Sequence, residues 1–157
     1  MIKFYKYQGT GNDFIMIDNR NQSFPKNDVE LVKKMCDRRF GIGADGLILL
    51  ENHESFDFQM VYYNSDGNES TMCGNGGRCI VAFAHFLNVF ENKAKFNAID
   101  GLHEAEINGN VVKLKMIDVP EIAKIGADYQ LNTGSPHFVR YVEDVQNLDV
   151  YKNGYEI

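Results

Sequence analysis

The sequence predicts an α+β fold in which a curved, mostly antiparallel sheet wraps around one central helix. Two observations support this prediction. Several short segments alternate apolar and polar residues, which is the period of a strand with one buried face. Among them lies one strongly apolar helical segment, residues 75–90, with apolar side chains around most of its circumference. Such a helix is normally enclosed on several sides, so the strands are expected to surround it.

The N-terminal part is expected to form two strands and a helix. Residues 2–7 alternate, and the turn sequence QGTGNDF and an apolar run at 14–18 follow, which predicts strand, glycine turn and strand. Residues 28–37 place their apolar side chains on one helical face, with Asn27 or Asp28 as the N-cap.

The remaining strands of this domain are predicted on both sides of the apolar helix. The loop RRFGIGADG has glycines that permit positive φ angles, and the turn NSDG and the dipeptide Asn108-Gly109 mark chain reversals. The segments between these signals are short and apolar or alternating, and they lie at 47–50, 56–63, 95–99, 103–107 and 111–117. After residue 120 the composition becomes loop-like.

Composition and charge exclude several classes of protein. The chain has 157 residues, 44 % of them apolar, which is typical of a soluble globular protein with one ordinary core. A formal charge of −6 without a Lys/Arg cluster argues against nucleic acid as a partner. No apolar run approaches a membrane span of about 18–20 residues, and the N-terminus does not resemble a secretory signal. Three cysteines without framework spacing predict a reducing compartment, the cytoplasm.

One short motif occurs twice in the chain. TGNDFI at 10–15 returns as TGSPHFV at 133–139, with an inserted proline. Chance resemblance and internal duplication both explain such an echo. If the duplication is real, residues 1–118 form one domain, and residues 119–157 are a linker and the truncated start of a second, homologous domain.

The candidate site is centred on Cys73, in the stretch NSDGNESTMCGNGGRC directly before the apolar helix. The first turn of a helix offers unpaired N–H groups and a partial positive charge. A carboxylate could therefore bind the amides of Gly74, Asn75, Gly76 and Gly77, with glycines allowing close approach. The same field favours a thiolate, which makes Cys73 a competent base or nucleophile.

The alternative reading is that Cys73 is a small structural residue in a tight loop, as most single cysteines are. Cys79 lies on another face of the helix and Cys36 on an amphipathic helix, so both are expected in the core. A metal site is not predicted, because the pair Cys73 and Cys79 lacks third and fourth ligands at recognisable spacing.

The blocks GTGNDF, RRFGIGADG, NSDGNESTMCGNGGRC and TGSPHFV, in this order, resemble the diaminopimelate epimerase family over essentially the whole chain. The resemblance implies two pseudo-symmetric halves, each a sheet around a central helix, with substrate between them. It implies interconversion of LL- and meso-diaminopimelate in lysine and peptidoglycan synthesis, without pyridoxal phosphate or any other cofactor. In such a mechanism a thiolate removes the α-proton and a thiol of the other half reprotonates the opposite face.

The resemblance also implies roles for individual residues. Cys73 is one acid/base, Gly74 and Asn75 donate backbone N–H groups to the α-carboxylate, and Asn12 and Asn64 bind polar groups of the substrate. In the substrate-binding set Ser135 stands where many members have asparagine. Gly46 stands where many have glutamine, so that contact is expected to be lost or replaced by backbone.

The block with the partner cysteine is absent, so the chain resembles the N-terminal portion of the family, and we expect it to be inactive alone. A homodimer is possible, since the family forms dimers. Two alternatives remain open at this point. One is another cofactor-independent amino-acid racemase or isomerase, and the other is a non-catalytic module that binds a small anion.

Overall fold

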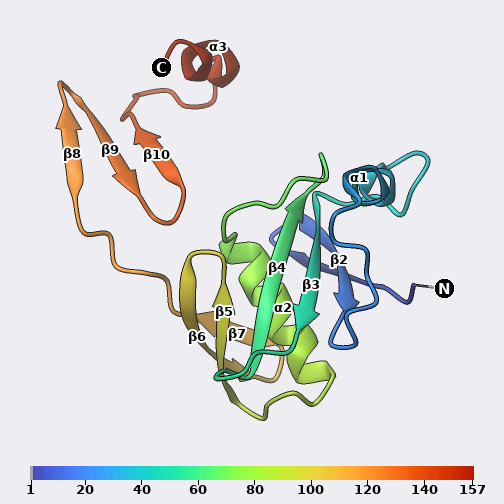
Figure 1. Cartoon of the computed structure of the whole chain (residues 1–157). Coiled ribbons are helices and arrows are strands. Elements are labelled where there is room, and N and C mark those ends of the chain that lie inside the picture. The colour runs from blue at the N-terminus through green and yellow to red at the C-terminus, as the bar shows by residue number, and fades with distance from the viewer. Residues whose placement is uncertain (1) are drawn as a thin grey trace. The chain divides into compact units, whose positions relative to one another are not determined.

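A computed structural model describes residues 2–157, which fall into two compact units divided between Ile117 and Asp118. The first unit contains a seven-stranded sheet in which the strands lie in chain order, and Figure 1 shows it curving around the helix α2. Because α2 contacts both edge strands, β1 and β7, the sheet encloses it, and the predicted α+β fold is confirmed. The strands are β1 (Tyr5–Gly9), β2 (Asn12–Asp18), β3 (Gly46–Glu51), β4 (Phe58–Asn64), β5 (Lys93–Ala98), β6 (Gly101–Asn108) and β7 (Val111–Leu114).

The sheet is mostly antiparallel, as predicted, with two parallel pairs. These pairs are β2 with β3 and β4 with β5. Each has a helix in its connection, α1 (Val29–Cys36) in the first and α2 (Gly74–Phe86) in the second. Parallel neighbours need such a crossover, whereas the remaining neighbours are antiparallel. The two helical connections thus lie where neighbouring strands keep the same direction.

Both predicted helices are present, but the sequence predicts their ends with different accuracy. Asp28 is the N-cap of α1, and its side chain accepts a hydrogen bond from the Leu31 N–H at 2.9 Å. The central helix ends at Phe86, so the prediction of a helix to residue 90 is wrong at its C-terminus. Asn88 adopts a left-handed conformation with φ of 56°, which ends the helix although the apolar pattern continues.

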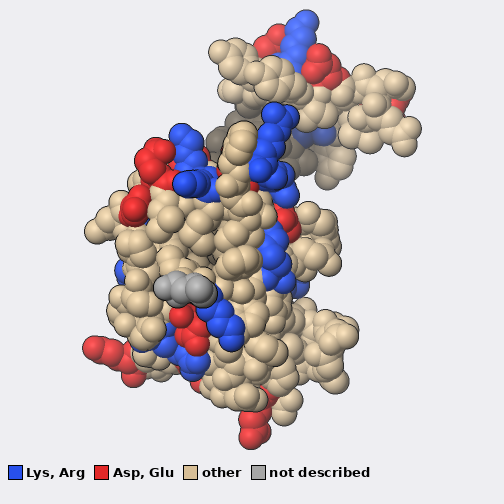
Figure 2. All heavy atoms as spheres, turned by 90° about the vertical axis from the view of Figure 1, so that its right-hand side faces the viewer, with Lys and Arg blue, Asp and Glu red and all other residues tan. Residues whose placement is uncertain are grey.

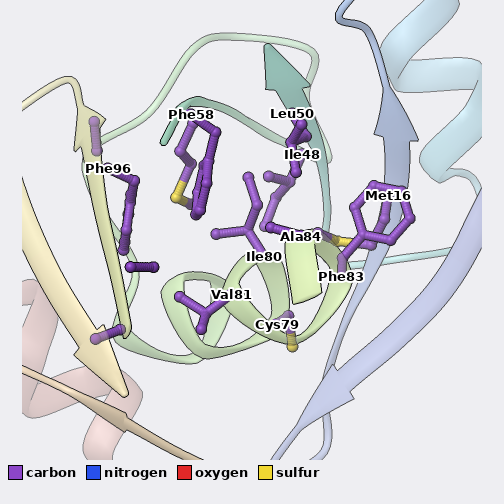
Figure 3. Packing of buried hydrophobic residues seen from close by; sticks show 14 of the residues in the cluster. Met16, Ile48, Leu50, Phe58, Cys79, Ile80, Val81, Phe83, Ala84 and Phe96 are labelled. Carbon is purple, nitrogen blue, oxygen red and sulfur yellow. The ribbon is translucent and has the colours of Figure 1, made fainter. Parts of the chain in front are cut away.

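Two clusters of buried side chains hold the first unit together. The larger lies between the sheet and α2, where Phe58 stacks on Phe96 with ring centroids 4.9 Å apart and Ile80 and Phe83 are fully buried (Figure 3). The smaller lies on the other face and contains Val32 of α1. Strand β3 contributes to both clusters, and all six of its residues are buried. Burial on both faces explains why this strand is a continuous apolar run without alternation.

The second unit is a small antiparallel sheet followed by a short helix. Its elements are β8 (Ile122–Ile125), β9 (Asp128–Asn132), β10 (Pro136–Val139) and α3 (Val150–Tyr155), with sheet order β10-β9-β8. These strands form although the composition after residue 120 is loop-like. Strand β8 has no face that is buried against a core, since all four of its residues are exposed. Within 118–157 no residue is buried.

Charged side chains of both signs are interspersed on the surface. Figure 2 shows Lys and Arg next to Asp and Glu on the face that it draws. Several form ion pairs across neighbouring strands, such as Lys93 with Glu106 at 3.0 Å and Lys95 with Glu104 at 3.2 Å. In the described part of the chain, no helix is long and apolar enough to cross a membrane.

Candidate active site

The hairpin between β1 and β2 carries Asn12 to the start of α2. Its two turn residues, Thr10 and Gly11, both have positive φ angles, 56° and 87°. A two-residue turn of this kind matches the twist of the flanking strands, and Asn12 is the first residue after it. An added Cβ on Gly9 would lie 3.3 Å from the Asn75 carbonyl oxygen, so the hairpin packs directly on the first turn of α2.

Cys73 is the N-cap residue of α2, with extended backbone angles. Its side chain makes no capping hydrogen bond, so the thiol leaves the first amides of the helix free of a side-chain cap. Of the three cysteines, Cys73 is partly exposed, whereas Cys36 and Cys79 are buried. Burial raises the pKa of both Cys36 and Cys79 to about 11, which keeps those thiols neutral. Their predicted place in the core is confirmed, and Figure 3 shows Cys79 among the buried side chains.

The side chains of Asn12, Cys73 and Asn75 meet. The Cys73 thiol donates to Asn12 Oδ1 at 3.6 Å, and Asn75 Nδ2 donates to the same oxygen at 3.4 Å. Arg78 and Thr10 in turn donate to Asn75 Oδ1. Three residues that the sequence proposes for one site are thus brought together by the tertiary structure, with Asn12 61 positions from Cys73 and 63 from Asn75.

Asp45 determines which way the Asn12 amide points. Asn12 Nδ2 donates to Asp45 Oδ2 at 2.7 Å. An ionised carboxylate only accepts hydrogen bonds, so the amide nitrogen must face Asp45 and the amide oxygen must face Cys73. The hydrogen bond from Asn12 is also the main cause that lowers the pKa of Asp45, which keeps this carboxylate ionised.

A cluster of charged side chains supports Asp45 from the solvent side. Arg38 Nη2 donates to Asp45 Oδ1 at 2.8 Å and to Asp13 Oδ1 at 2.7 Å. Lys6 Nζ donates to Asp13 Oδ2 at 2.7 Å and also reaches the Gly43 carbonyl. The bond from Arg38 is the main reason that the pKa of Asp13 is far below its ordinary value. Two cations thus balance two carboxylates beside the site.

Asn64 lies at the same end of the strands as Asn12, but its side chain makes different contacts. Gly46 pairs with Phe14 of β2 on one side and with Asn64 of β4 on the other, so Asn64 and Asn12 belong to neighbouring strand ends. The Asn64 side chain is exposed, and its Nδ2 donates to Ser70 Oγ at 3.0 Å. Its hydrogen bonds therefore hold the loop before Cys73.

Ser135 belongs to the second unit, in the turn between β9 and β10. Its carbonyl oxygen accepts a hydrogen bond from the Thr133 N–H at 3.1 Å. The neighbouring Gly134 has a φ angle of 99°, which a glycine tolerates in such a turn. A role of Ser135 in substrate binding stays a prediction.

The glycines after Cys73 do two different things. Gly74 is open, with its nearest neighbours 3.8 Å from an added Cβ. Gly76 and Gly77 are buried, and an added Cβ would come within 3.0 Å of Ile48 Cδ1 and 2.4 Å of Met72 Cε, respectively. The Gly77 amide already bonds to the Cys73 carbonyl at 2.7 Å. The expectation that all four amides serve a ligand is thus wrong for Gly77, whose amide bonds within the helix. The missing side chains of Gly76 and Gly77 let α2 pack closely on its neighbours.

Sequence reasoning missed the supporting residues of the site. Asp45, Arg38 and Asp13 are charged residues in or beside the glycine loops, and their spacing alone does not indicate mutual contact. Among the described residues, no group of three or more His, Cys, Asp or Glu side chains could hold a metal ion.

Comparison with solved structures identifies the fold first. A hydroxyproline epimerase from Agrobacterium vitis, with bound trans-4-hydroxy-L-proline, superposes on 98 % of this chain and 53 % of its own, with a TM-score of 0.63 and 12 % identity. At this identity the likeness concerns the fold, which is shared with racemases and epimerases.

Sequence comparison then identifies the family. Residues 4–120 match the family model described as diaminopimelate epimerase. A diaminopimelate epimerase from Flavobacterium psychrophilum is 63 % identical over 99 % of this chain, and one from Chlorobaculum tepidum is 47 % identical over 93 %. The chain belongs to the diaminopimelate epimerase family. It spans about three fifths of the length of these relatives, 61 % and 60 %.

Proposed function

We propose that this chain supplies the cysteine-bearing half of a diaminopimelate epimerase, which interconverts LL- and meso-diaminopimelate without pyridoxal phosphate or a metal. The observation that carries the proposal is the environment of Cys73. It is a partly exposed thiol at the N-terminus of α2, which has no side-chain cap. The thiol lies directly beside the Asn12 amide, whose orientation is determined by Asp45. The names of the relatives support the same activity.

The reaction begins at the α-carbon of the substrate. The α-carboxylate binds the backbone N–H groups of Gly74 and Asn75, where the helix N-terminus favours negative charge. The Cys73 thiolate takes the α-proton, so an S–H bond forms and the C–H electron pair remains on the α-carbon. Charge that spreads into the carboxylate is stabilised by the same preorganised amides.

Inversion requires a second acid on the opposite face of the α-carbon. A single thiol would return the proton to the side from which it came, so the product configuration depends on a thiol outside residues 1–157. We therefore expect the chain by itself to be inactive in epimerisation. Asn12, Asn64 and Ser135 are proposed to bind polar groups of the substrate, and a homodimer remains part of the proposal.

The test compares the protein of full family length with its Cys73→Ser variant. Loss of the acid/base should lower the rates of epimerisation and of α-proton exchange in D₂O at least about 10²-fold. Cys79→Ala is the matched control, because Cys79 is a buried core residue six positions further on. A Cys73→Ser variant with wild-type exchange, or full activity in the isolated 157-residue chain, contradicts the proposal.

A further inference from the structure

The space beside Gly46 is filled by the side chain of Tyr62 together with the backbone carbonyl of Tyr63. An added Cβ on Gly46 would lie 2.5 Å from Tyr62 Cε2, 2.5 Å from the Tyr63 carbonyl oxygen and 3.2 Å from the Tyr62 hydroxyl oxygen. Gly46 is in β3 and Tyr62 in β4, and Tyr62 pairs with Ile48, two residues beyond Gly46 on the same face. The absence of a side chain at Gly46 is thus what admits both the tyrosine ring and this carbonyl group.

The ring lies on the face of the sheet that α2 covers. Tyr62 contacts Phe14 edge to face with ring centroids 5.9 Å apart, close to the strand start that carries Asn12. Tyr62 and Cys73 are both partly buried against the same core cluster. The first turn of α2 packs on the residues beside Tyr62, since an added Cβ on Gly76 would meet Ile48 and Met60. The tyrosine therefore stands next to the N-terminus of α2.

The Tyr62 hydroxyl is available as a hydrogen-bond donor. Burial raises the pKa of Tyr62 to about 12, and the negative charge of Cys73 adds to this rise, so the hydroxyl stays protonated at neutral pH. Among residues 2–157, no group forms a hydrogen bond with it. A half-buried hydroxyl without a protein partner, beside a helix N-terminus, is suited to a ligand that accepts hydrogen bonds.

We infer that Tyr62 is a further substrate-positioning residue, whose hydroxyl donates a hydrogen bond to the carboxylate of an α-amino acid bound at the start of α2. The inference rests on the proposed function for the identity of the substrate. It adds a side-chain donor to the backbone amides of Gly74 and Asn75, and a carboxylate has enough lone pairs to accept from all three. Gly46 is then required for the place of the ring, because any larger residue would collide with Tyr62 and with the Tyr63 carbonyl.

The experiment uses the 157-residue chain and two alkylating reagents, iodoacetate and iodoacetamide. In iodoacetate the reactive carbon is attached to a carboxylate, as the α-carbon of an amino acid is, whereas iodoacetamide is neutral. The ratio of the two rate constants at Cys73, relative to the same ratio for glutathione, measures carboxylate recognition without any catalysis. The other two cysteines are buried, so labelling reports on Cys73, and peptide mass spectrometry verifies this.

Tyr62→Phe keeps the ring and removes the hydroxyl. We expect the iodoacetate rate to fall about tenfold, the lower range for a hydrogen bond to a charged acceptor, with the iodoacetamide rate unchanged. Tyr63→Phe is the matched control, because it removes the same atom from the next residue, which packs in the cluster on the other face of the sheet. In this variant the ratio should equal that of the wild type.

Each other outcome overturns the inference in a recognisable way. An unchanged ratio in Tyr62→Phe shows that the hydroxyl does not recognise the carboxylate, and an equal fall of both rates shows that it acts on the thiol instead. A wild-type ratio equal to that of glutathione would show that no carboxylate is recognised at the start of α2. That result would also contradict the proposed function. If the ratio falls as expected but the full-length protein does not epimerise diaminopimelate, the inference stands and only the proposed substrate is wrong.

Discussion

The two hairpins built on Thr-Gly differ in what surrounds them. In the first unit, Thr10 and Gly11 join β1 to β2, and Phe14 just beyond the turn is fully buried under α2. In the second unit, Thr133 and Gly134 lie between the antiparallel strands β9 and β10, and Phe138 is only partly buried. Similar local sequence therefore forms a hairpin in both units, with a core beneath it in only one.

The contacts of the two turns differ in range as well. The first turn delivers Asn12 to partners far away in sequence, Asp45 and Cys73. In the second turn the Thr133 hydroxyl bonds to the His137 ring at 2.8 Å and Gly134 N–H to Asn132 Oδ1, all within a few residues. Turn chemistry is thus sufficient for the hairpin, whereas a site also requires a packed framework that holds distant residues together.

The largest difference between the units is expected in the free energy of unfolding when a strand or helix isoleucine is replaced by alanine in each unit. Ile80→Ala in α2 removes a fully buried isoleucine and should lower the free energy of unfolding by about 2–5 kcal/mol. Ile125→Ala in β8 removes one that is 50 % exposed and should change it by less than about 0.5 kcal/mol. Urea unfolding followed by circular dichroism measures both. Equal effects would mean that β8 contributes to a core.

A smaller effect is expected from the turn glycines. Gly11→Ala and Gly134→Ala each force alanine into a positive φ, 87° and 99°, at a cost of about 1–2 kcal/mol. In the first unit the strain should lower the unfolding midpoint of the whole sheet. In the second it should appear only as faster amide exchange in β9 and β10. A shift of the main unfolding midpoint in Gly134→Ala contradicts this separation.

The smallest effect concerns the paired aspartates. The pKa of Asp13 is lowered mainly by Arg38, and that of Asp128 mainly by Arg140, whose Nη2 lies 2.7 Å away. A lowered folded-state pKa contributes stability that is present above the unfolded value, about 3.9, and is lost as the pH falls through the folded value. Asp13→Asn should therefore lower the stability of the first unit at pH 7, by less than about 1 kcal/mol, and weaken its decline below pH 4.

The control for this pH dependence is Asp128→Asn. Its carboxylate is paired in the same way but belongs to the unit without buried residues. The unfolding of the first unit should then keep its wild-type pH profile between pH 2 and 7. If Asp128→Asn changes that profile as much as Asp13→Asn does, the two units do not unfold independently.

Much of the fold could be predicted because its signals are local. The alternation in β4, the cap at Asp28 and the positive-φ turn before Asn12 all arise from residues a few positions apart. The place of Cys73 at the start of α2 is likewise a local property, since the glycines and the apolar period that follow it define a helix start. These features make the central residue of the candidate site recognisable without coordinates.

The prediction fails at the end of α2 and at two glycines of its first turns. The end of α2 depends on a left-handed Asn88, and nothing in the apolar period of the segment distinguishes it from a longer helix. The glycines at 76 and 77 look suited to a ligand, yet their neighbours Ile48, Met72 and Leu114 show that close packing requires them. A missing side chain can admit a substrate or another part of the chain, and sequence does not distinguish these uses.

The sequence by itself therefore determined the strands of the first unit, the enclosed helix and the thiol at its start, because hydrophobic period and turn chemistry act between near neighbours. Only the tertiary structure decided that Asp45 orients Asn12 toward Cys73 and that the Tyr62 ring occupies the space beside Gly46. The physical reason is that strand order and register bring these side chains together. A pattern that tells which face of a strand is buried does not tell which strand lies next to it.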